Sequence, residues 1–209
     1  MFAKKNTEQA VASEKKKETP KYTWQQNLSL YLHDMVYMLA AVMVLLMLFF
    51  RVIVVDGPSM ENTLLNGDYM LLVSNLFYRS PQPGDVVVVS KQAYDHGKPI
   101  VKRVIATEGQ EVDIDFEEGI VYVDGEALDE PYTKTLTTLK EGAVFPQKVE
   151  PGCVFVMGDN RNNSKDSRSL QIGQVDAREV LGKVICLVFP GTGMGGTQAR
   201  DFHRIGAVK

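Results

Sequence analysis

Residues 35–50 read MVYMLAAVMVLLMLFF, sixteen consecutive positions without a charged side chain. Arg51 interrupts this run, and apolar residues then continue to Val55, so that the segment spans twenty-one residues. A helix needs roughly 20 apolar residues to cross a bilayer. A buried core helix of this length would carry a polar stripe, and a cleaved signal peptide would have a shorter apolar run that ends in small residues. We therefore predict a transmembrane helix over residues 35–55.

The charges are distributed unevenly on the two sides of this segment. The 209 residues include 23 Lys and Arg against 26 Asp and Glu, a formal net charge of −3, which is not typical of a nucleic-acid-binding protein. Residues 1–23 carry six Lys and three Glu, a net charge of +3, which leaves −6 for the rest. Lysines beside a membrane helix stay on the cytoplasmic side. We predict a single-pass cell-membrane protein with residues 1–34 in the cytoplasm and 56–209 outside it.

The outer part of the chain has a β pattern. Its 154 residues are enough for one domain with its own core. Short runs rich in Val and Ile alternate with Gly, Pro and Asp clusters, and Asp124-Gly125 is typical of a hairpin turn. We predict a mainly β protein, with an all-β outer domain that ends in a flexible glycine-rich tail over 191–209. The expected strands are 69–73, 85–90, 100–106, 111–114, 120–123, 154–157 and 180–189.

The cysteines and histidines do not indicate a metal or a cofactor. Cys153 and Cys186 lie in separate strand-like runs, where they are either one disulfide between neighbouring strands or two buried free thiols. Neither has a Cys or His at ligand spacing. His33, His96 and His203 lie outside any polar motif, so a Ser-His-Asp site has little support. We expect no metal and no cofactor.

A hydrolase without a suitable histidine can use lysine as the base for a serine nucleophile. The lysine must be neutral, and burial has to lower its pKa from about 10.4 to roughly 7–8. Residues 100–105 read IVKRVI, so strand alternation places Lys102 on the face of Ile100 and Val104, opposite Arg103. The alternative is a solvated lysine on an edge strand, which spacing alone favours.

A serine and a polar loop complete this candidate site. Gly57 and Pro58 predict a turn before Ser59, where backbone amides can face an oxyanion. Residues 158–168 read GDNRNNSKDSR and follow an apolar run directly. Such a loop offers hydroxyls to orient a neutral amine and Asp/Arg pairs that brace it. The alternatives are an ordinary turn serine and a solvated loop.

Four segments in this order resemble the bacterial type I signal peptidases, membrane-anchored Ser-Lys endopeptidases that remove signal peptides from exported preproteins. The segments are 57–64 (GPSMENTL), 83–88 (PGDVVV), 101–106 (VKRVIA) and 158–168. The resemblance extends from about residue 35 to 189. It implies serine endopeptidase activity through an acyl-enzyme, with preproteins that have small residues at the first and third positions before the cut as substrates. It also implies contact between an apolar surface and membrane lipid.

The resemblance also implies roles for individual residues. Ser59 would be the nucleophile, Lys102 the general base, and Ser164 the hydroxyl that hydrogen-bonds the lysine amine. The implied fold is an almost entirely β catalytic core with an inserted β segment, here about 107–151. Structural roles around the site fall to Asp159, Arg161, Asp166 and Arg168.

Two positions depart from the family pattern. Asn62 stands where the family usually has Pro, which loosens the turn because Asn does not fix φ. Gly57 stands where some relatives have a serine that helps to bind the oxyanion, so the oxyanion hole would consist of backbone N–H groups, chiefly that of Ser59. A repressor-type Ser-Lys peptidase and a non-enzymatic tethered module are the alternatives. The anchor disfavours the first, and the presence of both Ser59 and Lys102 disfavours the second.

Overall fold

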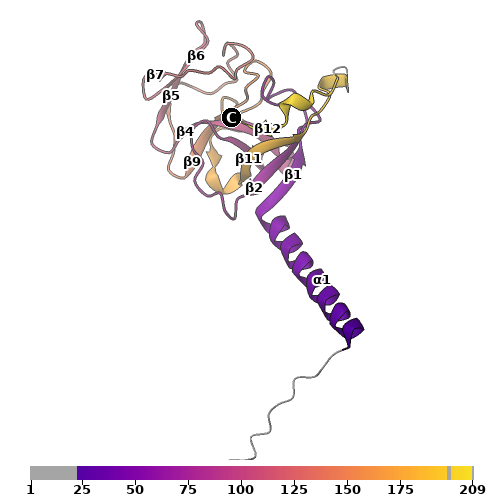
Figure 1. The fold of residues 1–209 in the computed structure, drawn as a ribbon. Helices are drawn as coiled ribbons and strands as arrows, with labels where there is room; N and C mark the ends of the chain where they lie inside the picture. The colour runs from indigo at the N-terminus through magenta and orange to yellow at the C-terminus, as the bar shows by residue number, and fades with distance from the viewer. Residues whose placement is uncertain (1–22, 197–198, 209) are drawn as a thin grey trace, which may run out of the picture. The chain divides into compact units, whose positions relative to one another are not determined.

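The computed structural model describes residues 23–196 and 199–208 (Figure 1). Its single α-helix within these ranges is α1 (Trp24–Phe49), which is long and apolar enough to cross a membrane. The rest of the described chain forms β-strands, loops and short 3-10 turns. The mainly β prediction is therefore confirmed. The 3-10 turns are Asp95–Gly97, Ala177–Glu179, Met194–Gly196 and Phe202–Arg204.

The predicted membrane helix needs correction at both ends. The helix begins eleven residues earlier than predicted, after Thr23, whose Oγ accepts from the Gln26 N–H while its own N–H donates to the Gln26 side chain. It ends at Phe49, because the β-branched residues that follow form strand β1 (Phe50–Val54) and pair with a second strand. The proposed cytoplasmic segment 1–34 lies mostly at residues 1–22, outside the described residues.

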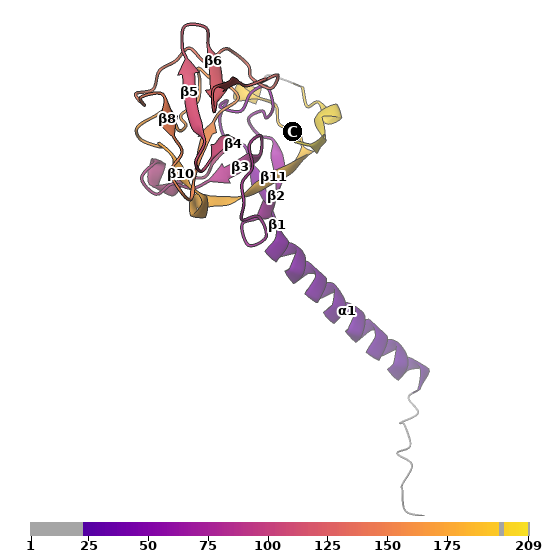
Figure 2. The same ribbon diagram turned by 90° about the vertical axis from the view of Figure 1, so that its left-hand side faces the viewer.

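The larger sheet has eight antiparallel strands (Figure 2). Lys102 belongs to one of its central strands, and Ser59 lies in the loop between its first two strands along the chain. Strand β12 (Gly206–Ala207) pairs with β11, outside the main path. Buried apolar side chains cover both faces of the central strands of the larger sheet. In spatial order the main path is β1, β2 (Tyr69–Ser74), β11 (Val180–Phe189), β3 (Val86–Val89), β4 (Ile100–Thr107), β9 (Cys153–Met157) and β10 (Val175–Asp176).

The segment between β4 and β9 forms a second sheet, which confirms the inserted β segment. Its strands, in the order β7-β6-β5-β8, are β7 (Glu126–Ala127), β6 (Ile120–Val123), β5 (Glu111–Asp115) and β8 (Gln147–Lys148). Asp124 and Gly125 connect β6 and β7 with φ of 53° and 81°, which confirms the hairpin turn. The insert packs on the larger sheet through a shared apolar core that includes Ile105, Val121 and Phe155.

All seven predicted strands are present, each within one residue of its expected ends. The sequence pattern missed β1 and four two-residue strands, which are defined by their partners more than by their own composition. The disulfide alternative is wrong, since Cys153 on β9 and Cys186 on β11 are separated by β3 and β4. Both thiols are free and partly exposed.

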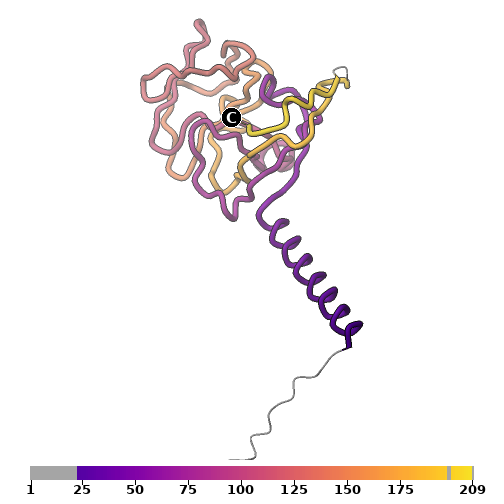
Figure 3. Tube along the Cα trace, viewed as in Figure 1, coloured from indigo at the N-terminus to yellow at the C-terminus, as the bar shows by residue number. Residues whose placement is uncertain are grey.

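The glycine-rich tail makes specific contacts that the prediction of a flexible segment did not include. Figure 3 shows the yellow C-terminal trace returning to the sheet, where β12 pairs with β11. The fully buried carboxylate of Asp68 accepts from the Gly191 N–H at 2.6 Å. Arg204 Nη2 lies 2.7 Å from the same carboxylate. The tail thus binds the loop that follows the Ser59 segment.

Candidate active site

Lys102 lies in a central strand and is buried on both sides. β4 is flanked by β3 and β9, and six consecutive residues of this strand are buried. Lys102 is only 3% exposed, so the alternative of a solvated edge lysine is wrong. Strand alternation is not what buries it, because neighbouring Arg103 is 1% exposed as well. Both faces of β4 are covered by other parts of the domain.

The Lys102 amine points at the Ser59 hydroxyl. Nζ lies 2.8 Å from Ser59 Oγ and 2.9 Å from the carbonyl oxygen of Val101. Burial lowers the pKa of Lys102 to about 8, and the negative charges of Asp166 and Asp159 partly oppose this effect. Roughly a tenth of the amine is therefore neutral at pH 7, and a base has to be neutral to accept a proton.

The turn before Ser59 is held by hydrogen bonds with two asparagines, one of which accepts and one of which donates. Gly57 has a φ of +104°, which L side chains rarely adopt, and its N–H donates to Asn66 Oδ1 at 2.8 Å. Asn160 donates its N–H to the Ser59 carbonyl at 3.0 Å and its side chain to the Pro58 carbonyl. In the hydrogen bonds of the described chain, the Ser59 N–H has no acceptor. Sequence reasoning singled out neither asparagine.

The polar loop packs directly against the Ser59 backbone. A Cβ at Gly158 would lie 2.5 Å from the Ser59 carbonyl oxygen and 2.2 Å from Ser164 Oγ, so only glycine allows this approach. The Gly158 N–H donates to Asp166 Oδ2 at 3.0 Å. The loop is therefore fixed to the serine turn on one side and to its own buried carboxylate on the other.

Ser164 is close to the site but bonds differently from the expectation. Its Oγ donates to Asp166 Oδ2 at 2.8 Å, and the two bonds of the Lys102 amine within the described chain go to Ser59 and Val101. A carboxylate accepts a stronger hydrogen bond than a neutral amine. Arg168 donates to both oxygens of Asp166 at 2.8 Å, so this carboxylate organises the loop.

Two further ion pairs support the loop, and each has a partner that the sequence did not reveal. Arg103 donates to both oxygens of Asp159, at 2.9 and 2.7 Å, and both side chains are almost fully buried. Thr63 Oγ also donates to Asp159. Arg161 pairs with Glu130 of the inserted segment. Asp159, Arg161, Asp166 and Arg168 thus lie together, but no local pattern indicates that Arg103 and Glu130 join them.

Comparison with known families decides the relationship. The model of the family described as "Signal peptidase, peptidase S26" matches residues 28–189. The chain belongs to this family. Among its relatives is the probable signal peptidase I-1 of Synechocystis sp., 38% identical over an alignment of 167 positions that covers 76% of this chain and 82% of that protein.

Two further comparisons concern other members of the signal peptidase family. Signal peptidase I of Bacillus caldolyticus is 38% identical over 148 residues, which cover 63% of this chain and 75% of that protein. A crystal structure of a signal peptidase I from Enterococcus faecalis aligns with a TM-score of 0.40 and 27% identity, covering 50% of this chain and 96% of that one.

A cavity of about 230 Å³ opens in front of the serine and lysine. Its lining comes from β1 and the residues after it, from the Ser59 turn, and from the start of β4. Apart from Ser59, Lys102, Asp56 and Lys98, the lining residues are apolar. The Ser59 hydroxyl and the Lys102 amine therefore lie beside a mostly apolar cavity.

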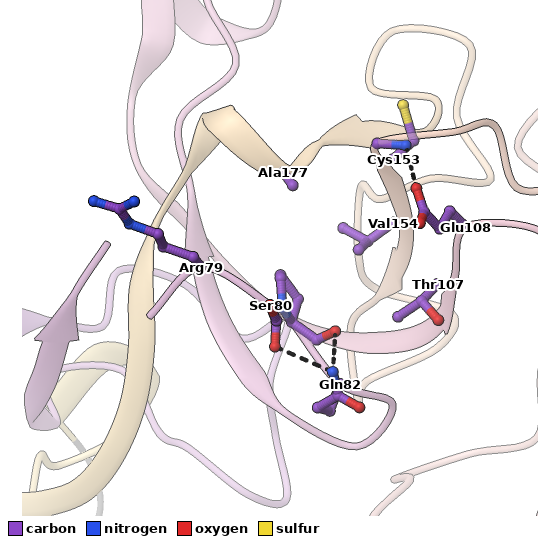
Figure 4. A pocket seen from close by; sticks show the side chains of 10 residues that line it. Arg79, Ser80, Gln82, Thr107, Glu108, Cys153, Val154 and Ala177 are labelled. Carbon is purple, nitrogen blue, oxygen red and sulfur yellow. Dashed lines mark hydrogen bonds between the residues drawn. The ribbon is translucent and has the colours of Figure 1, made fainter. Parts of the chain in front are cut away.

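A second cavity, of about 310 Å³, is lined by other residues than Ser59 and Lys102 (Figure 4). Its polar side chains mostly bond to backbone: Glu108 accepts from the Gly152 N–H, and the Gln82 amide donates to the carbonyls of Ser80 and Pro81. Arg79 points away from the other labelled residues (Figure 4). The described ranges hold no group of three His, Cys, Asp or Glu side chains placed for a metal. The smaller cavity is the candidate active site.

Proposed function

We propose that this chain is a membrane-bound serine endopeptidase that removes N-terminal signal peptides from exported preproteins. The observation that carries this proposal is the 2.8 Å contact between the buried Lys102 amine and the Ser59 hydroxyl beside an apolar cavity. Membership of the signal peptidase family supports it, as do the relatives named signal peptidase I.

In the proposed mechanism, neutral Lys102 removes the proton from Ser59 Oγ as that oxygen attacks the scissile carbonyl. The ammonium then returns the proton to the leaving amine, and an ester forms at Ser59. Lys102, neutral again, activates a water that hydrolyses the ester and regenerates the hydroxyl. The Ser59 N–H, which has no acceptor within the described chain, would donate to the oxyanion.

The neighbouring residues have supporting roles in this proposal. Gly57 gives the turn its shape. Its N–H donates to Asn66 and is therefore not available to an oxyanion. Ser164 acts through Asp166 to keep the loop at its close distance from the Ser59 backbone. Asp159, Arg161 and Arg168 brace the same loop through buried ion pairs.

We further propose how the protein is placed in the membrane. Helix α1 would be the anchor, with the Lys-rich residues 1–23 on the cytoplasmic side. The β domain, which begins with β1 at Phe50, would then lie outside the cytoplasm, where exported preproteins emerge. Its inserted segment covers about 107–151. Apolar side chains near the site would rest on membrane lipid.

The substrate would bind as an extended strand in the cavity. Residues 53–56 form one wall and residues 98–102 form the other. Side chains alternate in an extended peptide, so the first and third residues before the cut would point to the apolar floor. The small volume of the cavity favours small residues at these two positions.

Cleavage of a purified preprotein by the detergent-solubilised full chain tests the proposed function. We expect a mature product that lacks the signal peptide, identified by mass spectrometry of its new N-terminus. A serine-directed acylating inhibitor should block the reaction and leave its adduct on Ser59, the hydroxyl activated by Lys102. A preprotein that stays intact, or an adduct on another residue, would contradict the proposal.

The pH dependence of kcat/KM should report the buried lysine. Because Lys102 has to be neutral to act, kcat/KM should rise about tenfold per pH unit below its pKa and level off above about 8. Initial rates between pH 6 and 10 on a preprotein without titratable groups near the cut provide the measurement. A profile that rises until the ordinary lysine pKa of 10.5 is incompatible with a desolvated base.

A further inference from the structure

An ion pair bridges the rim of the active-site cavity. Lys98 Nζ lies 2.8 Å from Asp56 Oδ2, and both residues line the cavity with Ser59 and Lys102. Their side chains are 54% and 72% exposed, so the pair lies at the mouth of the cavity and not in its floor. These are the two charged residues of the lining besides Lys102.

The two partners come from opposite walls of the cavity. Asp56 follows β1 and is two residues beyond its last residue, whereas Lys98 precedes the first residue of β4 by two positions. An extended substrate between these walls would have to pass the pair. Since the first and third residues before the cut point to the floor, the second points outward, to the rim.

We propose that Asp56 and Lys98 determine which charge the substrate carries at the second residue before the cut. This inference rests on the proposed function. As an ion pair, the two side chains have no net charge, and each is the partner of the other. They therefore favour an uncharged residue at that position, because a Glu or a Lys there has to compete with an existing partner.

Both groups are charged at neutral pH, and their contact favours the charged form of each. The hydrogen bond to Lys98 lowers the pKa of the Asp56 carboxyl, and the hydrogen bond to Asp56 raises the pKa of the Lys98 ammonium. Removal of one partner leaves the other as an unpaired charge at the rim. A single substitution should therefore create a preference for the opposite charge in the substrate, since complementary charges across an interface determine partner choice.

The test uses three otherwise identical signal-peptide substrates with Gln, Glu or Lys at the second residue before the cut. For wild type we expect the highest kcat/KM with Gln. Lys98→Met should favour the Lys substrate over the Glu substrate by about two- to fivefold, and Asp56→Asn should favour Glu over Lys by a similar factor. Both preferences should weaken at 0.5 M salt, because salt screens the interaction between the exposed charge of the enzyme and that of the substrate.

Three controls make the result decisive. The charge swap Asp56→Lys with Lys98→Asp restores a pair and should restore the preference for Gln. Arg178→Met breaks an exposed ion pair that does not line the cavity and should leave the order of substrates unchanged. Ser59→Ala should be inactive on all three substrates; activity there would overturn the proposed function itself. If both single variants keep the wild-type order on an active enzyme, the charge-reading inference is wrong.

Discussion

Replacing Lys102 with methionine is expected to reduce kcat for preprotein cleavage by about 10³-fold or more, and Ser59→Ala by a similar factor. Lys102 is the only base within hydrogen-bond distance of Ser59 Oγ among the described residues. Methionine keeps the length and the apolar contacts of the buried stem but cannot take a proton. Because each variant removes half of one proton-transfer pair, Ser59→Ala combined with Lys102→Met should be no worse than either alone.

Stability measurements separate this loss from unfolding. The lysine carries a desolvation cost that lowers its pKa, so Lys102→Met should leave the Tm unchanged or raise it. Lys91→Met is the matched control, since Lys91 is also a partly buried lysine bonded to a backbone carbonyl, but does not line the cavity. It should retain wild-type kcat. Retention of near wild-type turnover by Lys102→Met would rule out the proposed pair.

Replacing Arg103 with methionine is expected to lower the free energy of unfolding by about 3–5 kcal/mol. Arg103 and Asp159 form a bidentate pair with side chains that are 2% and 0% exposed. The substitution leaves a buried carboxylate with the hydroxyl of Thr63 but without its cation. Activity should fall as well, because Asp159 belongs to the loop that packs on the Ser59 backbone.

Urea unfolding of the full chain in detergent measures this change in the free energy of unfolding. The β signal in circular dichroism monitors the transition. Arg178→Met is the control. Arg178 pairs with Asp176, but its side chain is 89% exposed, so this substitution should change the free energy of unfolding little. Arg103→Met combined with Asp159→Leu removes both charges and should recover part of the lost stability. Equal effects of Arg103→Met and Arg178→Met would mean that the buried pair is not important for the fold.

The sequence motifs identify the residues of the candidate site but not all of their hydrogen-bond partners. Ser59, Lys102 and the stretch 158–168 are recognisable because their order and residue types are typical of one family. The hydrogen bond expected from Ser164 to the lysine amine is replaced by one to Asp166. A motif gives the residues that share a site, but the partner of each donor depends on distances that a motif does not contain.

Local patterns determined seven of the strands, the existence of an apolar helix and the hairpin at Asp124, because periodicity and turn chemistry act over a few residues. Only the tertiary structure decided where the helix ends, since Phe50–Val54 becomes a strand by pairing with β2. Only it decided that Lys102 is buried, because β3, β9 and the packing on both faces of β4 come from distant parts of the chain. The net charge of −3 counts Lys102 as a cation, whereas its burial lowers the pKa to about 8 and makes the neutral amine accessible. Charge is counted along the sequence, but the cost of keeping it depends on what the fold places around it.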